Sequence, residues 1–203
     1  MTTLITGGSG LVGRALQGDI KLSSKDGDLR SWDTTISLFK HYKPDYIIHC
    51  AARVGGVASN MRYKGEFYYD NIMINTNVLE AARQVKAKKV VSFLSTCIFP
   101  AEIEYPLTEN KIHLGAPHHS NYGYAYAKRM LDVQTRMYRE QYGVDYICVV
   151  PTNIYGIGDN HLFPITTYSS GEKDNNRLQI LTDNPIPLQG SATGYSVEMN
   201  EPI

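Results

Sequence analysis

Tyr124 and Lys128 are the residues of this sequence whose types and spacing most directly suggest chemistry. Side chains four residues apart lie on the same face of a helix, so the lysine ammonium would lie beside the tyrosine phenol. A nearby cation favours the phenolate and lowers the phenol pKa. Tyr124 could then pass a proton to or from a carbonyl or alcohol oxygen while hydride moves at the adjacent carbon. The alternative is an ordinary contact on a helix surface.

Ser95 favours the catalytic interpretation of this pair. It follows an apolar run at the expected carboxyl end of a strand, where its hydroxyl can bond the same oxygen from the sheet side. Cys97 lies two residues further on. A thiol that a nearby cation helps to deprotonate is a suitable acid/base. The alternative for Cys97 is a small buried residue beside the strand end.

A glycine-spaced turn near the N-terminus predicts a site for a dinucleotide. Gly7, Gly10 and Gly13 follow the apolar strand of residues 4–6 at three-residue intervals. The first glycine can take the tight turn, the second lets backbone approach a pyrophosphate, and the third lets the helix pack closely. N–H groups of the first helical turn then face the phosphates. We expect phosphate contacts from Gly7, Ser9, Gly10, Leu11, Val12 and Gly13, the alternative being a glycine-rich loop without a ligand.

The end of the second expected strand distinguishes the two nicotinamide cofactors. Sites for NAD usually place a carboxylate there, whereas the 2′-phosphate of NADP needs hydroxyl and cationic donors. Ser23, Ser24 and Lys25 are donors of the second kind, so we expect NADP(H) with Ser24 and Lys25 as ligands. Asp26 and Asp28 are close by, and they keep open the alternative that Lys25 is only a solvated turn residue.

Alternating apolar strands and helices predict the fold class. Strands are expected at residues 4–6, 20–24, 45–50, 89–95 and 145–151, and helices at 11–17, 33–42, 70–86 and 121–142, with Asp33 as an N-cap. This βαβ spacing predicts an α/β fold with a Rossmann-type, doubly wound parallel sheet and right-handed crossovers. Ligands bind at the carboxyl ends of such strands, so the small residues Ala51 and Ala52 should border one.

Composition excludes several classes of function. The 203 residues include 20 basic and 20 acidic side chains, which gives no bias toward nucleic acid or anionic membranes. No apolar stretch approaches the roughly 18 residues of a membrane span, and no signal peptide is evident, so we expect a cytoplasmic protein. The three cysteines are too few for a disulfide framework, and no Cys/His pair has zinc-ligand spacing, so no metal is expected.

Five stretches resemble the GDP-L-fucose synthase family of the extended short-chain dehydrogenase/reductase superfamily. They are residues 6–13, 54–56, 95–100, 120–129 and 151–156, of which Ser-Thr-Cys-Ile-Phe-Pro at 95–100 is the most specific. The resemblance implies NADPH-dependent epimerisation and reduction of GDP-4-keto-6-deoxymannose to GDP-L-fucose. Hydride would go to the C4 ketone and Tyr124 would protonate its oxygen. Lys128 would hold the nicotinamide ribose, and Cys97 would shuttle the protons beside the ketone.

The resemblance also implies further contacts and a dimer. Asp28 and Leu29 would lie by the adenine, residues 54–56 would line the nicotinamide side, and Asn71 would brace the active-site helix. Expected cofactor contacts besides the phosphate turn are then Ser24, Lys25, Asp28, Leu29, Ala51, Ala52, Val54, Tyr124, Lys128, Pro151 and Asn153. Expected substrate contacts are Val54, Gly55, Ser95, Thr96 and Asn153. A homodimer through helices near 70–86 and 122–142 is expected.

Residues 161–203 depart from the family pattern. The family continues with a catalytic histidine, a substrate-binding arginine and a large C-terminal domain. His161 comes too early to be carried over as that histidine and is kept as an alternative. We therefore predict an NADP-binding domain at 1–160 and an irregular tail at 161–203 with one possible strand at 177–181. NADP(H) should bind, while the sugar nucleotide should be reduced poorly or not at all. The alternatives are another NAD(P)-dependent sugar-nucleotide epimerase or dehydratase, against which Cys97 argues, and a non-catalytic NADP-binding module.

Overall fold

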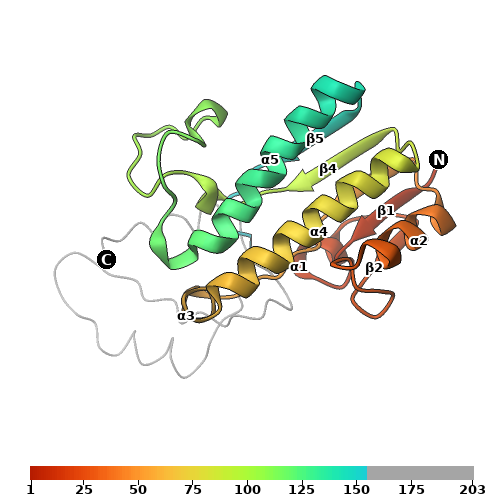
Figure 1. Ribbon diagram of the computed structural model, residues 1–203, viewed down its shortest axis with the longest axis horizontal. Coiled ribbons are helices and arrows are strands. Elements are labelled where there is room, and N and C mark those ends of the chain that lie inside the picture. The colour runs from red at the N-terminus through yellow and green to blue at the C-terminus, as the bar shows by residue number, and fades with distance from the viewer. Residues whose placement is uncertain (155–203) are drawn as a thin grey trace. The chain divides into compact units, whose positions relative to one another are not determined.

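A parallel sheet organises the described part of the chain, residues 1–154 of this computed structural model (Figure 1). The strands are β1 (Thr3–Thr6), β2 (Ile20–Leu22), β3 (Tyr46–His49), β4 (Lys89–Phe93) and β5 (Asp145–Val149). They are arranged in the order β2-β1-β3-β4-β5, and each neighbouring pair is parallel. The chain divides into two units, 1–151 and 152–203, and the description below concerns the first. The predictions for His161, for 177–181 and for the rest of the tail lie outside the described residues.

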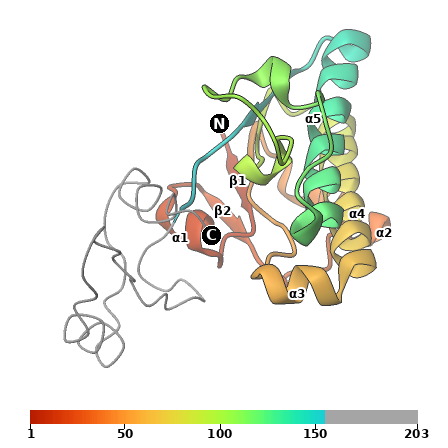
Figure 2. The same cartoon turned by 90° about the vertical axis from the view of Figure 1, so that its left-hand side faces the viewer.

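Helices lie on both faces of this sheet. They are α1 (Leu11–Ala15), α2 (Trp32–Tyr42), α3 (Val57–Arg62), α4 (Lys64–Gln84) and α5 (Tyr122–Tyr142), with 3₁₀ turns η1 (Thr96–Ile98), η2 (Glu109–Lys111) and η3 (His119–Asn121). Figure 2 shows α2, α4 and α5 on one side of the sheet and α1 on the other. The crossover from β1 to β2 runs opposite to the later ones, so right-handed connections must place its helix on the opposite face. The predicted doubly wound parallel sheet is confirmed.

Most element ends differ from the prediction by one or two residues, and the start of α4 differs by six. Helix α2 begins one residue earlier than expected, because Ser31 and not Asp33 is the N-cap, with its side chain accepting from the Thr34 N–H. Helix α4 begins at Lys64, six residues early, and α3 precedes it. The first turns of α4 are polar or tyrosine-rich, and of them only Phe67 is buried before Asp70, so apolar periodicity is weak there.

Two rows of side chains on one sheet face support the site. Leu4, Ile47, Val90 and Tyr146 are paired in register and fully buried. Two residues further along each strand, and therefore on the same face, lie Thr6, His49, Ser92 and Cys148. Helices α4 and α5 cover this face, since their side chains bond the second row. The core is therefore apolar in its middle and polar where the strands end.

His49 links four elements within the polar row. Its Nδ1 lies 2.8 Å from the Thr6 hydroxyl, and its Nε2 lies 3.1 Å from Oδ1 of the Asn75 side-chain amide. The Asn75 amide nitrogen in turn donates to the Ala127 carbonyl at 3.3 Å. Because an amide oxygen can only accept, Nε2 carries the proton and Nδ1 accepts from Thr6. Burial lowers the pKa of His49 to about 3, so the ring is neutral at pH 7. Through Asn75, His49 holds α5 at Ala127, the residue before Lys128.

Candidate active site

The glycine turn after β1 lies where the sheet's crossover direction reverses, the usual ligand position in open α/β sheets. Gly7 has a φ of +70°, and a Cβ there would lie 2.7 Å from the Ala51 nitrogen. A Cβ on Gly13 would overlap the Gly7 carbonyl oxygen. A Cβ on Gly10 would approach only that oxygen, at 3.2 Å. Gly7 therefore serves the turn and Gly13 the helix packing, as predicted. Gly10 leaves the backbone open, and its contact with a pyrophosphate stays a prediction.

Helix α1 begins at this open surface. Gly10 is its N-cap, no side chain caps the helix, and its first turn contains no acidic residue. Backbone N–H groups at a helix start favour anions, and here no carboxylate from the helix itself opposes one. Ser9 and Gly10 are exposed, while Leu11 and Val12 are half-buried. This arrangement fits the phosphates of a dinucleotide.

The turn after β2 presents hydroxyl and ammonium groups. The Asp26 carboxylate accepts from the Ser23 N–H at 2.7 Å and from the Ser23 hydroxyl at 2.8 Å. These hydrogen bonds hold the pKa of Asp26 below its ordinary value. Asp26 thus stabilises its own turn, and the side chains of Ser24 and Lys25 stay exposed beside it.

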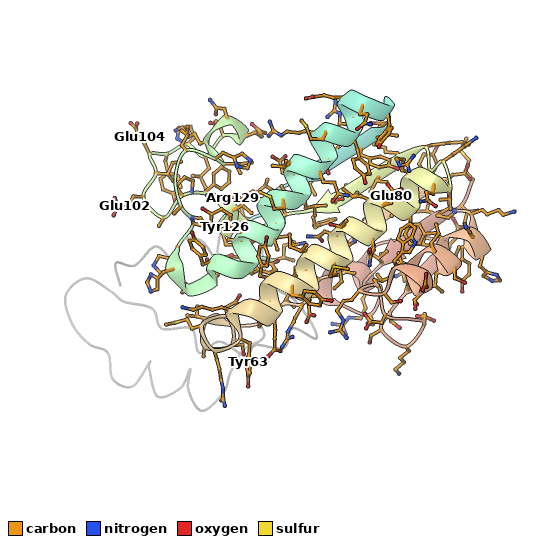
Figure 3. The ribbon with its side chains drawn as sticks, viewed as in Figure 1. Tyr63, Glu80, Glu102, Glu104, Tyr126 and Arg129 are labelled. Atoms are coloured by element: carbon orange, nitrogen blue, oxygen red, sulfur yellow. The ribbon has the colours of Figure 1, made fainter. Side chains whose placement is uncertain are left out.

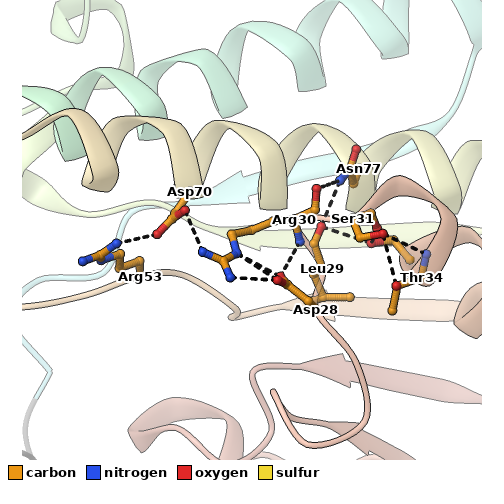
Figure 4. A network of polar contacts seen from close by, with 9 residues as sticks. Asp28, Leu29, Arg30, Ser31, Thr34, Arg53, Asp70 and Asn77 are labelled. Atoms are coloured by element: carbon orange, nitrogen blue, oxygen red, sulfur yellow. Dashed lines mark hydrogen bonds and ion pairs between the residues drawn. The ribbon is translucent and has the colours of Figure 1, made fainter.

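A network of charged side chains joins the loops after β2 and β3 (Figure 4). Asp70 of α4, whose side chain is 8% exposed, accepts from Arg30 Nη1 at 3.0 Å and from Arg53 Nη1 at 2.6 Å. Burial raises the pKa of Asp70, but the two arginines outweigh burial and hold it below its ordinary value. Arg30 also pairs with Asp28 at 2.8 Å. One carboxylate therefore ties together two loops that border the expected dinucleotide.

This network limits what Asp28 and Leu29 can offer a ligand. The Asp28 carboxylate already accepts from the Arg30 backbone and guanidinium. The Leu29 side chain belongs to the core, and its carbonyl accepts from Thr35 and Asn77. Any contact of Leu29 with adenine is thus restricted to its remaining backbone atoms, and the contacts of both residues stay predictions.

The predicted catalytic side chains come together where β4 ends against α5. Lys128 is 2% exposed, its Nζ donates to the Phe93 carbonyl at 2.7 Å, and it lies 5.9 Å from the centroid of the Tyr124 ring. Ser95 is the N-cap of η1, and its Oγ accepts from the Cys97 N–H at 3.4 Å. Cys97 in turn interacts electrostatically with Lys128 and Tyr124. Ser95, Cys97, Tyr124 and Lys128 therefore form one group.

Two pKa shifts in this group correct the sequence prediction. Burial raises the pKa of Tyr124 above its ordinary value, whereas we predicted that Lys128 would lower it. Lys128 lies over the ring and donates to a carbonyl instead of the phenol oxygen, so burial dominates. Burial also raises the pKa of Cys97, although Ser95, Lys128 and Arg129 oppose this. Both groups are therefore protonated at neutral pH. Burial lowers the pKa of Lys128 to about 8.

The segment after β3 is held by an asparagine in an unexpected way. Asn71 accepts from the Arg53 N–H and donates to the Arg53 carbonyl, both at 3.0 Å. It therefore braces this segment, and Asn75, which sequence reasoning missed, braces the active-site helix through Ala127. The spacing of four residues between the two asparagines on α4 was the available signal.

The remaining predicted contacts vary in exposure. Ala51, Ala52 and Thr96 are half-buried, whereas Val54 and Gly55 are exposed. Pro151 ends the first unit, and Asn153 belongs to the second, so the contacts of Asn153 stay predictions. Within residues 1–154 no group of three His, Cys, Asp or Glu side chains could hold a metal ion. None of the helices in that range is long and apolar enough to cross a membrane.

The chain is similar to several known proteins over most of its length. It is 51% identical to the GDP-L-fucose synthase of Dictyostelium discoideum over 171 residues, covering 79% of this chain and 53% of the relative. It is 47% identical to a probable GDP-L-fucose synthase of Drosophila melanogaster, covering 78% and 53%. A GDP-L-fucose synthetase of Naegleria fowleri, solved with bound NADP, has a TM-score of 0.72 and 46% identity, covering 78% of this chain and 55% of the other.

The chain spans about half the length of the curated relatives it matches. The model of the NAD dependent epimerase/dehydratase family matches residues 3–184. That match includes the glycine turn, the group around Lys128 and the strands that carry them. This chain therefore belongs to the NAD dependent epimerase/dehydratase family.

Proposed function

We propose that this chain takes part in the NADPH-dependent epimerisation and reduction of GDP-4-keto-6-deoxymannose to GDP-L-fucose. The observation that carries the proposal is that Ser95, Cys97, Tyr124 and Lys128 meet at the sheet edge that also carries the glycine turn. This pair of reactions requires an acid for the ketone oxygen and an acid/base for the flanking carbons, and Tyr124 and Cys97 can supply these groups. The names of the similar proteins support the same reaction.

NADP(H) fits the residues present. The turn from Gly7 to Gly13 would receive the phosphates, and Ser24 and Lys25 would bond the 2′-phosphate. Ala51, Ala52 and Val54, which follow β3, would border the nicotinamide side. NADPH supplies the hydride when bound. That the similar Naegleria protein was solved with NADP supports this assignment.

Reduction requires a proton donor at the ketone oxygen. Tyr124 is suited to this role because burial keeps its phenol protonated. The O–H bond of Tyr124 breaks as its proton joins the oxygen that becomes the alcohol. Ser95 accepts from the Cys97 N–H, and its hydroxyl proton stays available for the same oxygen. Lys128 would hold the nicotinamide ribose through its ammonium group.

Epimerisation requires a base at the carbons beside the ketone. A Cys97 thiolate would take the proton, so that a C–H bond breaks, an S–H bond forms and the electron pair moves to the ketone oxygen. The pair returns to carbon when an acid protonates the opposite face, which inverts that centre. Ser95 can stabilise the resulting charge on that oxygen. Burial opposes the thiolate, so nearby cations must support it.

We also propose a cytoplasmic homodimer. Cys50, Cys97 and Cys148 are free thiols, which suits a reducing compartment. Large apolar side chains are exposed on α4 and α5, namely Tyr68, Tyr69, Met130, Met137 and Tyr142. Pairing these two helices with those of a second copy would cover that surface. A monomeric mass by light scattering at tens of micromolar would contradict the dimer.

A paired measurement tests the reaction on the 203-residue chain. Calorimetry should show NADPH binding, and a stopped assay with GDP-4-keto-6-deoxymannose should show little or no turnover. Orienting a large substrate can supply about 7–11 kcal/mol of a barrier, and the given chain spans about half the length of the curated relatives it matches. Turnover at an ordinary rate of about 1–10³ per second would contradict this expectation, and failure to bind NADPH would contradict the function.

Two substitutions test the assigned roles wherever turnover is measurable. Tyr124→Phe should abolish reduction, and Cys97→Ser should slow epimerisation selectively, since acid/base groups contribute about 10²–10⁴-fold. Tyr42→Phe and Cys148→Ser are matched controls from α2 and β5. If Cys97→Ser left the rate and the product ratio unchanged, Cys97 would be a packing residue and not an acid/base.

A further inference from the structure

Helix α5 carries two consecutive buried cations. Lys128 and Arg129 are each 2% exposed, and within residues 1–154 neither forms an ion pair with a carboxylate. Figure 3 labels Arg129 on α5 together with Tyr126, whose ring lies 5.2 Å from the guanidinium carbon. A buried unpaired charge is costly. The mechanism above uses Lys128 but leaves Arg129 without a role.

The two cations hold opposite ends of one short segment. Lys128 Nζ donates to the Phe93 carbonyl at 2.7 Å, and Arg129 Nε donates to the Ile98 carbonyl at 2.5 Å. Ser95 and Cys97 lie between these two carbonyls. Since Lys128 and Arg129 are neighbours on one rigid helix, the segment is fixed at both ends relative to α5.

Arg129 keeps binding capacity that the fold does not use. Its Nη2 is buried and has no hydrogen-bond partner among residues 1–154. The charged and titratable groups that face Cys97 are Lys128, Arg129 and Tyr124 from α5, together with the Ser95 hydroxyl of its own turn. The two cations are the groups that oppose the effect of burial on the thiol through charge. Removing Arg129 would leave Lys128 alone in this task.

We propose that Arg129 is a positioning residue for Cys97, which holds the η1 turn through the Ile98 carbonyl and stabilises the Cys97 thiolate with its positive charge. The thiol gives its proton to solvent, and the thiolate then accepts the proton from the carbon beside the ketone. The use of the thiolate rests on the proposed function. Its formation does not, because it can be measured without substrate.

Alkylation of Cys97 by iodoacetamide tests this proposal on the full chain. The rate is followed against pH by mass spectrometry of the peptide that contains Cys97. Arg129→Gln and Arg129→Met remove the charge, Arg129→Lys keeps it, and Arg136→Gln removes an arginine that is 50% exposed on the same helix. Loss of one nearby charge should raise the midpoint of the profile of alkylation rate against pH by about one pH unit. Below that midpoint, alkylation should be about tenfold slower. Arg129→Lys and Arg136→Gln should stay within about 0.3 unit.

The shape of the profile separates charge from structure. A merely structural change alters access to Cys97 and scales the rate equally at every pH, with an unchanged midpoint. That result in a neutral variant that folds by circular dichroism would overturn the proposal. Failure of both neutral variants to fold would also overturn it, since Arg129 would then serve the core. A midpoint shift in a chain that fails to bind NADPH would sustain the proposal and count only against the proposed function.

Discussion

Alanine at Gly10 and at Gly13 should separate cofactor binding from folding. A Cβ on Gly13 would lie 2.8 Å from the Gly8 Cα and 2.9 Å from the Gly7 carbonyl carbon, closer than real Cβ contacts. A Cβ on Gly10 would meet only the Gly7 oxygen, at 3.2 Å. Gly13→Ala therefore disturbs the fold, whereas Gly10→Ala fills the surface that should face the phosphates.

The magnitudes follow from these contacts. Overpacking costs about 1–3 kcal/mol, so Gly13→Ala should lower Tm by roughly 2–12 °C at about 2–4 °C per kcal/mol. Gly10 has φ −75° and ψ 174°, which alanine adopts without strain. Reduced freedom of the unfolded chain contributes about 0.4–1 kcal/mol in favour of Gly10→Ala and offsets its one close contact. Loss of one charge-assisted contact of about 1.5–3 kcal/mol should weaken NADPH binding about tenfold or more.

Thermal unfolding without cofactor and calorimetry with NADPH measure the two effects separately. Gly65→Ala is the matched control, because a Cβ there meets nothing within 4 Å and the position is in the first turn of α4. It should raise stability by about 0.5–1 kcal/mol and leave binding unchanged. The reasoning is refuted if Gly10→Ala binds NADPH as tightly as the parent, or if Gly13→Ala keeps the parent's Tm.

Three further predictions concern charge. Lys25→Glu should narrow or reverse the preference for NADPH over NADH by calorimetry, and equal affinities of the parent for both cofactors would contradict the role of Lys25. Because burial lowers the pKa of His49 to about 3, below about 6.5 in the unfolded chain, its contribution is complete above pH 6.5 and is lost as pH falls toward 3. The urea midpoint of His49→Gln should therefore fall less steeply between pH 6.5 and 4, where the parent's free energy of unfolding drops by up to about 1.4 kcal/mol per pH unit. Parallel curves of midpoint against pH for variant and parent would count against this. Asp70→Asn should cost about 1–3 kcal/mol in urea denaturation, and the 58%-exposed Asp145→Asn no more than about 0.5; equal costs would show that the buried network adds nothing.

Local patterns in the sequence determined the elements and the spacing of the site. The five strands were predicted because buried parallel strands are continuous apolar runs. Gly143 takes a left-handed conformation at the end of α5, as a helix terminator should. The spacing of Tyr124 and Lys128 placed both on one helix face, and the glycine intervals predicted each glycine's packing. These properties depend on residues within about one turn or strand of each other, except the close approach of Gly7 to Ala51.

Tertiary structure alone decided how the site is charged and held. Sequence spacing predicted a lowered pKa for Tyr124, but burial by elements distant in the chain raised it. The Asp70 network and the link from His49 to Ala127 join loops and helices separated by tens of residues. The sequence analysis did not single out Arg129, whereas the fold buries its side chain and bonds it to the Ile98 carbonyl of η1. The burial of a side chain and its distance from residues far along the chain depend on how the whole chain folds, so local sequence patterns do not contain them.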